Sequence, residues 1–377
     1  MNFTKLSQYV DSLPAAGVPG CDLAVCRDHE LLFRRQAGYR DDANTQTMRG
    51  DEAYCLYSCT KVFTTCAAMQ LIGAGKMGLD DPVSDYLPVY AHLQVKDGAG
   101  VRPAKTVMTV RQLMSMQSGL NYDLGTDPVR RATEKASGDP TTRQVAEAKA
   151  LDPLEFDPGT NFLYSLSHDV LAAVIEVVSG QRFSEYLQAH IFAPLGLRTA
   201  SFALSAETAA RMCAQYILDD QQKKLLPCAP DANHLRIGSA YESGGAGLIC
   251  DVKDYITFAD ALACGGKSAD GTQILAPEMI QLWSANQLGP RSRTAFDGWN
   301  RVGYSYGLGV RTRVDVSKGG RGSIGEFGWD GAAGSYAVID PHRHISAFYA
   351  MHVRNFLYSY DVIHPTLRNL IYEAMEE

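Results

Sequence analysis

The chain has 377 residues, 46% of them hydrophobic, which predicts a globular protein with a large core and two lobes. Its 35 basic and 42 acidic side chains give a net charge of −7 with the basic residues scattered, which argues against a nucleic-acid partner. No run approaches the roughly 18 apolar residues that span a bilayer, and the first residues lack an apolar export segment, so we expect a cytoplasmic protein with no membrane partner.

The first elements predicted along the chain are a short helix and a β-hairpin. Residues 3–13 have the periodicity of an amphipathic helix, and strand-like runs at 21–27 and 30–39 flank the polar turn Asp28–His29. From Thr60 to about Ile72 the pattern changes to a helix that is apolar on most sides and is ended by glycines. Such a helix belongs in the core.

The middle of the chain is predicted to be mainly helical, and strand signals return beyond about residue 300. Because strands occur at both ends, we expect one antiparallel sheet built from both chain ends and flanked by helices, an α+β fold with a helical insertion. We predict a discontinuous sheet domain of residues 1–65 and 235–377, a helical domain of residues 66–234, and an active site in the cleft between them.

Ser58 is the one serine in this chain with a lysine three places on, within the stretch YSCTKVFTT. A three-residue helical spacing puts both side chains on one face, so Lys61 can reach the Ser58 hydroxyl. A serine becomes a good nucleophile when a base removes its proton, and lysine can do so only if burial lowers its pKa. The alternative is that Ser58 caps a helix and Lys61 is solvated in the first turn.

Two later segments carry further candidates. Tyr164 stands in a polar turn just before a buried helical run, and it would otherwise be an ordinary core tyrosine. A glycine-dense turn containing Trp329-Asp330-Gly331 precedes a strand, and glycines there allow close approach of the backbone to a ligand. The alternative for this turn is a plain hairpin.

Together and in this order, the three segments resemble the serine β-lactamase and penicillin-binding-protein superfamily. The resemblance is closest to class C β-lactamases and the related family VIII carboxylesterases, whose motifs are S-x-x-K, then Y-x-N or Y-S-x, then K-T-G or W-G-G. It extends from roughly residue 15 to 350, through stretches such as GAGKMGLDDPVSDYLP, LMSMQSGL and FDPGTNFLYSLSHDVLAAVIEVVSG. Such collinearity is far more specific than any single motif.

The resemblance implies a role for each matching residue. Ser58 would be the nucleophile, Lys61 its base or proton relay, and Tyr164 the group that moves a proton between serine, lysine and leaving group. The backbone amides of Ser58 and Ala332 would form the oxyanion hole. Residues expected to contact the substrate are Trp329, Asp330, Gly331 and Tyr122, although a packing role is as good an interpretation of Tyr122. No metal or cofactor is implied.

This chain departs from the β-lactamase pattern at two positions. Leu166 stands where β-lactamases and peptidases commonly have an amide, and Trp329 replaces the lysine of K-T-G, which would bind a substrate carboxylate. Both losses favour a neutral ester substrate. Asp330 is also unusual, because the esterases have a small residue there. Its carboxylate would repel anionic substrates and attract cationic ones, or it would pair with a nearby arginine.

These observations predict a serine hydrolase that cleaves small neutral carboxylic esters through an acyl-enzyme on Ser58, and weak β-lactamase activity is compatible with this. A β-lactamase, a D-amino-acid peptidase or amidase, or an acyltransferase would use the same machinery. A non-catalytic binding protein with this fold is the alternative of another class, although Ser58, Lys61 and Tyr164 are intact. The expected partner is a small-molecule ester or amide, and the oligomeric state stays open.

Two other motifs are given structural interpretations. Ser305 lies in a G-x-S-x-G, but the residues that follow are strand-like, whereas a nucleophile elbow needs a helix there. The glycines of residues 320–325 fit G-x-G-x-x-G without opening a helix, so a dinucleotide site is not predicted.

The nine cysteines are odd in number and lack C-x-x-C spacing, so we expect reduced thiols.

Overall fold

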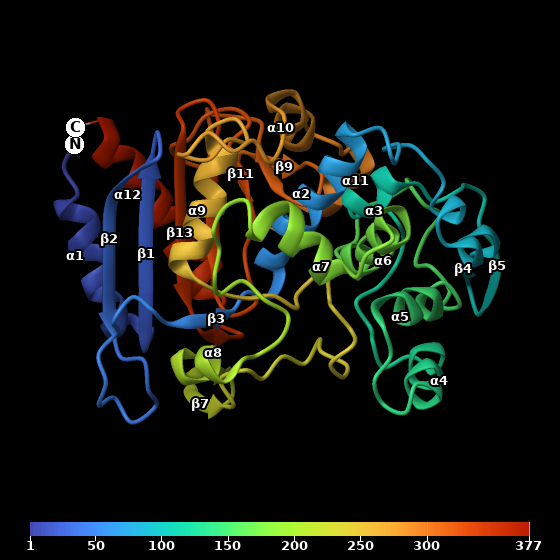
Figure 1. Ribbon diagram of the computed structural model, residues 1–377, viewed down its shortest axis with the longest axis horizontal. Coiled ribbons are helices and arrows are strands. Elements are labelled where there is room, and N and C mark those ends of the chain that lie inside the picture. The colour runs from blue at the N-terminus through green and yellow to red at the C-terminus, as the bar shows by residue number, and fades with distance from the viewer. Residues whose placement is uncertain (300, 377) are drawn as a thin grey trace.

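The main element of the protein is a seven-stranded antiparallel sheet (Figure 1). The computed structural model describes residues 1–299 and 301–376. The strand order is β2-β1-β13-β12-β11-β10-β9. The strands are β1 (Gly20–Arg27), β2 (Glu30–Gly38), β9 (Tyr304–Tyr306), β10 (Arg311–Arg313), β11 (Phe327–Gly328), β12 (Tyr336–Asp340) and β13 (Ile345–Met351).

Strands from the two ends of the chain are neighbours in this sheet. β1 pairs with β13, with Cys21 opposite Met351 and Arg27 opposite Ile345. β1 also forms the predicted hairpin with β2 through Asp28 and His29, whose φ angles of 50° and 68° suit a two-residue hairpin turn. The predicted α+β fold, with one antiparallel sheet built from both chain ends, is confirmed.

Different helices cover the two faces of the sheet, as the alternation of side chains along β1 shows. Leu23 and Val25 pack in a core with α1 (Thr4–Ser12) and α12 (His364–Glu376). Ala24, between them, points to the opposite face and packs in a core that contains α9 (Val252–Ala263). The period of two along the strand therefore separates two hydrophobic layers.

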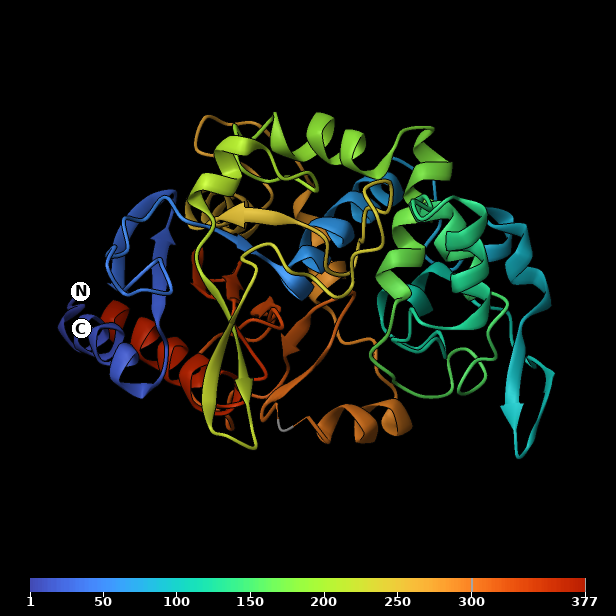
Figure 2. The same cartoon turned by 90° about the horizontal axis from the view of Figure 1, so that it is seen from below.

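A mainly helical region lies at the end of the molecule opposite the two termini (Figure 2). α2 (Thr60–Gly73) runs through the core and packs against α6 (Ser167–Ser179). Most of its residues are buried on every side, as its apolar pattern predicted. The other helices of this region are α3 (Val110–Met114), α4 (Asp127–Lys135), α5 (Thr142–Lys149) and α7 (Phe183–Leu187).

Shorter elements complete the fold. A two-stranded pairing of β3 (Ala53–Cys55) with β8 (Ile249–Asp251) lies directly before α2 and α9 in the sequence. The remaining elements are β4 (Gln94–Asp97), β5 (Gly100–Pro103), α8 (Ala206–Arg211), β6 (Gln215–Asp219), β7 (Lys224–Cys228), α10 (Pro277–Ser284), α11 (Pro290–Asp297) and β14 (Val353–Arg354).

One strand-like stretch in the region beyond residue 300 is divided in the structure. The strand-like run at 306–316 is interrupted between β9 and β10, which pair with each other, because Gly309 has a φ of 76° that turns the chain back.

The domain boundaries at residues 65 and 234 stay a prediction. Among the helices of the described residues, none has the length and apolar character needed to cross a lipid bilayer.

Candidate active site

Ser58 lies at the junction of β3 and α2, in a single turn of 3-10 helix formed by Tyr57–Cys59. Tyr57 has a φ of 47°, in the left-handed region that residues other than glycine rarely adopt. Its hydroxyl lies 2.6 Å from Oε1 of Gln215 and 2.7 Å from the carbonyl oxygen of Ala232. These buried contacts hold the strained residue in place, and they thereby fix the position of Ser58.

Lys61 is fully buried, so the alternative of a solvated lysine is wrong. Its Nζ lies 3.1 Å from Oγ of Ser58 and donates to the carbonyl oxygen of Gly245 at 2.7 Å. Burial lowers the pKa of Lys61 to about 7, although the nearby Asp169 carboxylate opposes this shift. Near neutral pH a large fraction of this amine is therefore unprotonated and able to accept the proton of Ser58.

Tyr164 precedes α6 and lies beside both Lys61 and Trp329. Its hydroxyl accepts a hydrogen bond from Nε1 of Trp329 at 2.9 Å, and Nζ of Lys61 lies 4.6 Å from the centroid of its ring. Burial raises the pKa of Tyr164 well above its usual value, whereas hydrogen bonds with Ser58 and Trp329 oppose that rise. The structure thus brings together the four side chains that the three motifs singled out.

Tyr122 has a closer relation to the lysine than the sequence indicated. Its hydroxyl accepts a hydrogen bond from Nζ of Lys61 at 3.2 Å, and its ring stacks on that of Tyr164 with centroids 5.5 Å apart. Burial raises its pKa, and a hydrogen bond with Ser58 opposes the rise. Tyr122 also lines a cavity beside Ser58. It therefore belongs to the hydrogen-bond network of Ser58 and Lys61.

Asp169 is a site residue that sequence reasoning missed. It lies in α6 with 3% of its surface exposed, and its Oδ1 accepts hydrogen bonds from Tyr241 at 2.7 Å and Ser243 at 2.5 Å. Its Oδ2 has no hydrogen-bond partner among the described residues. This buried charge limits how far the pKa of Lys61 falls. A carboxylate in the first turn of a largely apolar helix, five residues after Tyr164, was the available signal.

The glycine-dense turn packs against the backbone that precedes Ser58. A methyl group added at Gly331 would collide with the carbonyl oxygen of Leu56 and with the hydroxyl of Ser335. Glycine is therefore required for this approach. Among the described residues, the amides of Ser58 and Ala332 donate to no acceptor. Both N–H groups thus remain available for an oxyanion, the role proposed for them from the motifs.

Asp330 lines the pocket but has only 5% of its surface exposed. Its Oδ1 accepts from Arg311 at 3.0 Å, and its Oδ2 forms an ion pair with Arg301. Although burial alone would raise its pKa, the two guanidinium groups hold it below the usual value. Of the two interpretations left open for Asp330, the structure shows the arginine pairing, so little net charge faces a substrate.

Two cavities meet at Ser58, with volumes of about 300 Å³ and about 470 Å³. Both are lined by Ser58, Tyr164, Trp299 and Ala332, and the larger one continues toward Phe162, Leu163 and Leu235. Their walls are mostly apolar and aromatic. The site therefore suits a substrate with an uncharged acyl or alcohol group on either side of the nucleophile.

The other motifs have no place in this site. Ser305 is fully buried in β9, where its Oγ donates to Oδ1 of Asn286 at 2.5 Å. Residues 320–325 lead into β11 rather than a helix. Neither segment lines the cavities beside Ser58.

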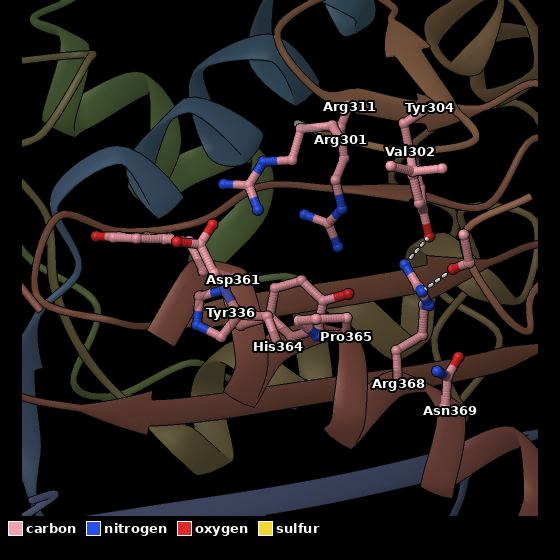
Figure 3. A pocket seen from close by; sticks show the side chains of 12 residues that line it. Arg301, Val302, Tyr304, Arg311, Tyr336, Asp361, His364, Pro365, Arg368 and Asn369 are labelled. Atoms are coloured by element: carbon pink, nitrogen blue, oxygen red, sulfur yellow. Dashed lines mark hydrogen bonds between the residues drawn. The ribbon is translucent and has the colours of Figure 1, made fainter. Parts of the chain in front are cut away.

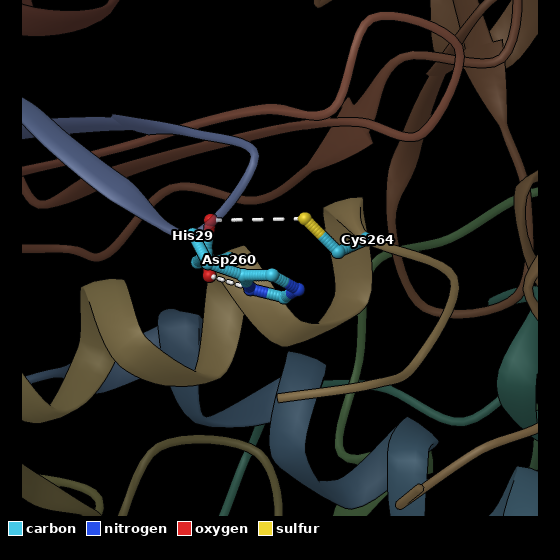
Figure 4. A group of neighbouring side chains, drawn as sticks. All are labelled: His29, Asp260 and Cys264. Carbon is cyan, nitrogen blue, oxygen red and sulfur yellow. Dashed lines mark hydrogen bonds and ion pairs between the residues drawn. The ribbon is translucent and has the colours of Figure 1, made fainter. Parts of the chain in front are cut away.

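One group of possible metal ligands lies apart from the candidate site, at the end of α9 (Figure 4). Nδ1 of His29 lies 2.7 Å from Oδ2 of Asp260, and Sγ of Cys264 lies 3.9 Å from Oδ1 of the same carboxylate. Burial, together with the charge of Asp260, raises the pKa of Cys264 to about 12, so its thiol stays protonated. The contacts are those of a histidine–carboxylate hydrogen bond with a thiol beside it, and none of the three residues lines the cavities at Ser58.

Comparisons with known proteins agree with this geometry. A family model described as Beta-lactamase matches residues 6–361. Esterase EstB of Burkholderia gladioli is 28% identical over 346 residues, which cover 85% of this chain and 82% of that protein. Acyltransferase calJ of Penicillium decumbens is 27% identical over 349 residues, covering 85% of this chain and 80% of that protein. The solved structure of EstCE1, a hydrolase with promiscuous acyltransferase activity, matches in fold with a TM-score of 0.79 at 24% identity, covering 100% of this chain and 98% of that one.

Proposed function

Because the chain belongs to the Beta-lactamase family and is a serine enzyme with hydrolase or acyl-transfer chemistry, we propose that it is a carboxylesterase that cleaves small neutral esters through an acyl-enzyme on Ser58. The observation that carries this proposal is the buried amine of Lys61, 3.1 Å from Oγ of Ser58, with a pKa lowered to about 7. The free thiols of all nine cysteines support a site of action in the reducing cytoplasm.

Acylation would start with proton transfer from Oγ of Ser58 to the neutral amine of Lys61, as Oγ bonds to the ester carbonyl carbon. The negative charge that forms on the carbonyl oxygen would be stabilised by the amides of Ser58 and Ala332, each worth roughly 3 kcal/mol in the transition state. The bond to the alcohol oxygen then breaks, and that oxygen receives a proton through Tyr164. Water repeats the sequence on the acyl-enzyme and regenerates Ser58.

The surroundings of Trp329 support a neutral substrate. The indole nitrogen of Trp329 is engaged by the Tyr164 hydroxyl, and the indole lies in the wall of the cavity where the related β-lactamases have a lysine. Asp330, next to it, is paired with arginines and adds little charge. The cavity thus offers mainly apolar surface beside the oxyanion hole, although Arg301 and Asp361 also line it.

We expect short p-nitrophenyl esters to be cleaved readily and benzylpenicillin slowly or not at all. A charge-assisted contact to a carboxylate contributes roughly 1.5 to 3 kcal/mol, so its absence costs about one to two powers of ten in kcat/KM for anionic substrates. Trp329→Lys should narrow this gap, and Trp329→Phe is the matched control that restores no cation. Steady-state kinetics would measure the ratio of kcat/KM for the p-nitrophenyl ester to kcat/KM for benzylpenicillin. Penicillin hydrolysis by the unmodified protein at or above the ester value would favour a β-lactamase instead.

Replacing Tyr164 and Tyr122 in turn by phenylalanine should lower kcat by different factors. Tyr164→Phe should lower kcat by about a hundredfold or more, because it removes the group proposed to carry the proton to the leaving group. Tyr122→Phe should lower kcat by only about tenfold, because it removes one acceptor of Lys61. It should also shift the pH midpoint of kcat/KM downward, since that acceptor favours the protonated amine. A larger loss in Tyr122→Phe than in Tyr164→Phe would exchange the two roles.

Acyl transfer to an acceptor other than water is a second candidate function. It is favoured by the similarity to acyltransferase calJ and by the second cavity beside Ser58, which leaves room for an acceptor next to an acyl group. Hydrolysis of a p-nitrophenyl ester with increasing concentrations of a small alcohol would separate the two. A new ester that forms at the expense of free acid would establish transfer, whereas acid alone would establish hydrolysis.

A further inference from the structure

A third cavity, of about 270 Å³, adjoins one of the cavities at Ser58, and Figure 3 shows the side chains that line it. It is formed by the first turns of α12 together with β9, β10 and β12. Arg301, Tyr360 and Asp361 line both this cavity and the smaller of the two cavities at Ser58. The two spaces are therefore neighbours that share part of their walls.

Three guanidinium groups surround this space, from Arg301, Arg311 and Arg368 (Figure 3). Arg301 and Arg311 each direct one nitrogen to Asp330. Nε of Arg301 has no hydrogen-bond partner among the described residues. Because each guanidinium group has five N–H donors, both groups keep donors that their contacts with the protein do not use.

Arg368 differs from the other two arginines in its direct contacts. It has 6% of its surface exposed, and no described carboxylate forms an ion pair with it. It donates to the hydroxyl of Tyr304 at 2.9 Å and to the carbonyl oxygen of Gly319, which are both neutral, while its Nε has no partner. The buried carboxylate of Glu326 attracts the guanidinium through space, and the hydroxyl of Tyr304 lies between the two groups. A buried cation whose direct hydrogen-bond partners are all neutral is still costly, and an anion in the cavity would offset that cost.

Two of the acidic groups near these arginines, Asp330 and Glu326, are not among the residues that line the cavity. Asp330 is shared between two arginines, and Oε1 of Glu326 lies 3.8 Å from Arg311. Asp361 is exposed at the side that faces solvent. The interior surface therefore presents guanidinium donors, together with the amide side chain of Asn369.

We propose that this cavity is a binding site for a small oxyanion, a carboxylate or a phosphate group, held by Arg301, Arg311 and Arg368. Guanidinium groups match the planar and bidentate geometry of such anions. Bound anion would share Arg301 and Arg311 with Asp330, the residue that precedes the turn of Gly331 and Ala332. Occupancy of the cavity is thereby coupled to the position of the oxyanion-hole turn.

Titration calorimetry with sodium phosphate, at ionic strength held constant with sodium chloride, tests the proposal without any turnover. Asn369→Asp keeps the shape and the acceptor of residue 369 and adds one negative charge to the lining, so phosphate affinity should fall by about tenfold. Asp361→Asn removes a negative charge, so affinity should rise by about threefold. Asn44→Asp, in an exposed distant loop, is the matched charge control and should leave the affinity unchanged.

Two results would overturn the proposal. One is the lack of saturable phosphate binding by the folded protein up to about 10 mM. The other is phosphate binding that Asn369→Asp leaves at full strength, which would place the anion elsewhere. Because the ester substrate plays no part in these measurements, either result leaves the proposed esterase function standing.

A second measurement, which rests on the proposed esterase function, distinguishes a carboxylate of the substrate from a free anion. The p-nitrophenyl hemiester of glutaric acid carries a remote carboxylate, and p-nitrophenyl butyrate is its neutral counterpart. If Asn369→Asp lowers kcat/KM for the hemiester alone, the cavity binds the substrate's own carboxylate. If Asn369→Asp changes kcat/KM for the two esters by the same factor, the cavity binds a free anion.

Discussion

Replacing Ser58 by alanine is expected to lower kcat by at least about ten-thousandfold, because every later step of the proposed mechanism needs the bond to Oγ. The unmodified protein should gain one phosphonyl mass from a fluorophosphonate, and peptide mapping should place the label on Ser58. Ser58→Ala should take up no label. The substitution removes one buried hydroxyl and should leave the fold intact, which circular dichroism would check.

Ser305→Ala is the matched control, because Ser305 lies in the only G-x-S-x-G of the sequence and is also buried. It should keep both labelling and turnover near the level of the unmodified protein. Label on Ser305, or loss of activity in Ser305→Ala alone, would contradict the proposed nucleophile. An intact Ser58 with no adduct from any ester or phosphonate would instead favour a binding protein.

Lys61→Met is expected to lower kcat by about a hundredfold or more, because methionine fills the same buried space and cannot accept a proton. In the unmodified protein, kcat/KM should rise with pH through about 7, since the amine form is required and burial lowers the pKa of Lys61 to that value. Below this pH the ammonium form dominates and activity falls. A rate that stays constant down to about pH 5 would remove Lys61 as the base.

The same lysine makes a prediction about stability. Its pKa is about 7 in the folded protein and near 10.5 in the unfolded chain, so the unfolded state binds more protons between these values. The free energy of unfolding should therefore rise with pH across that window, and Lys61→Met should lose this contribution. Denaturant titrations at pH 7 and pH 9 would measure the difference.

Local patterns in the sequence were sufficient for most elements of the fold. The hairpin of β1 and β2 follows from alternating side chains around the Asp28–His29 turn, and α2 follows from its apolar residues and terminal glycines. Both depend on neighbours within a few residues, which the sequence contains directly. The division of the strand-like run at 306–316 was harder to predict, because the turn at Gly309 depends on one φ angle and not on the period of the hydrophobic residues.

The sequence also determined which residues meet on one helical face. The three-residue spacing of Ser58 and Lys61 predicts their contact, which is 3.1 Å in the structure. The order of the three motifs indicated Tyr164 and Trp329 as their neighbours, and the chain brings these residues together from segments more than 100 positions apart. That inference depended on family resemblance, because spacing along a chain carries no information about distant contacts.

Only the tertiary structure decided the charge states and partners of the buried groups. The pKa of Lys61 depends on complete burial and on Asp169, which approaches from α6. The pairing of Asp330 depends on Arg301 and Arg311, and the burial of Arg368 without a direct ion pair depends on how α12 packs beside the sheet. Desolvation and Coulomb energies are set by distances in space, so residue types and their order fix the candidates while the packing of distant segments fixes their chemistry.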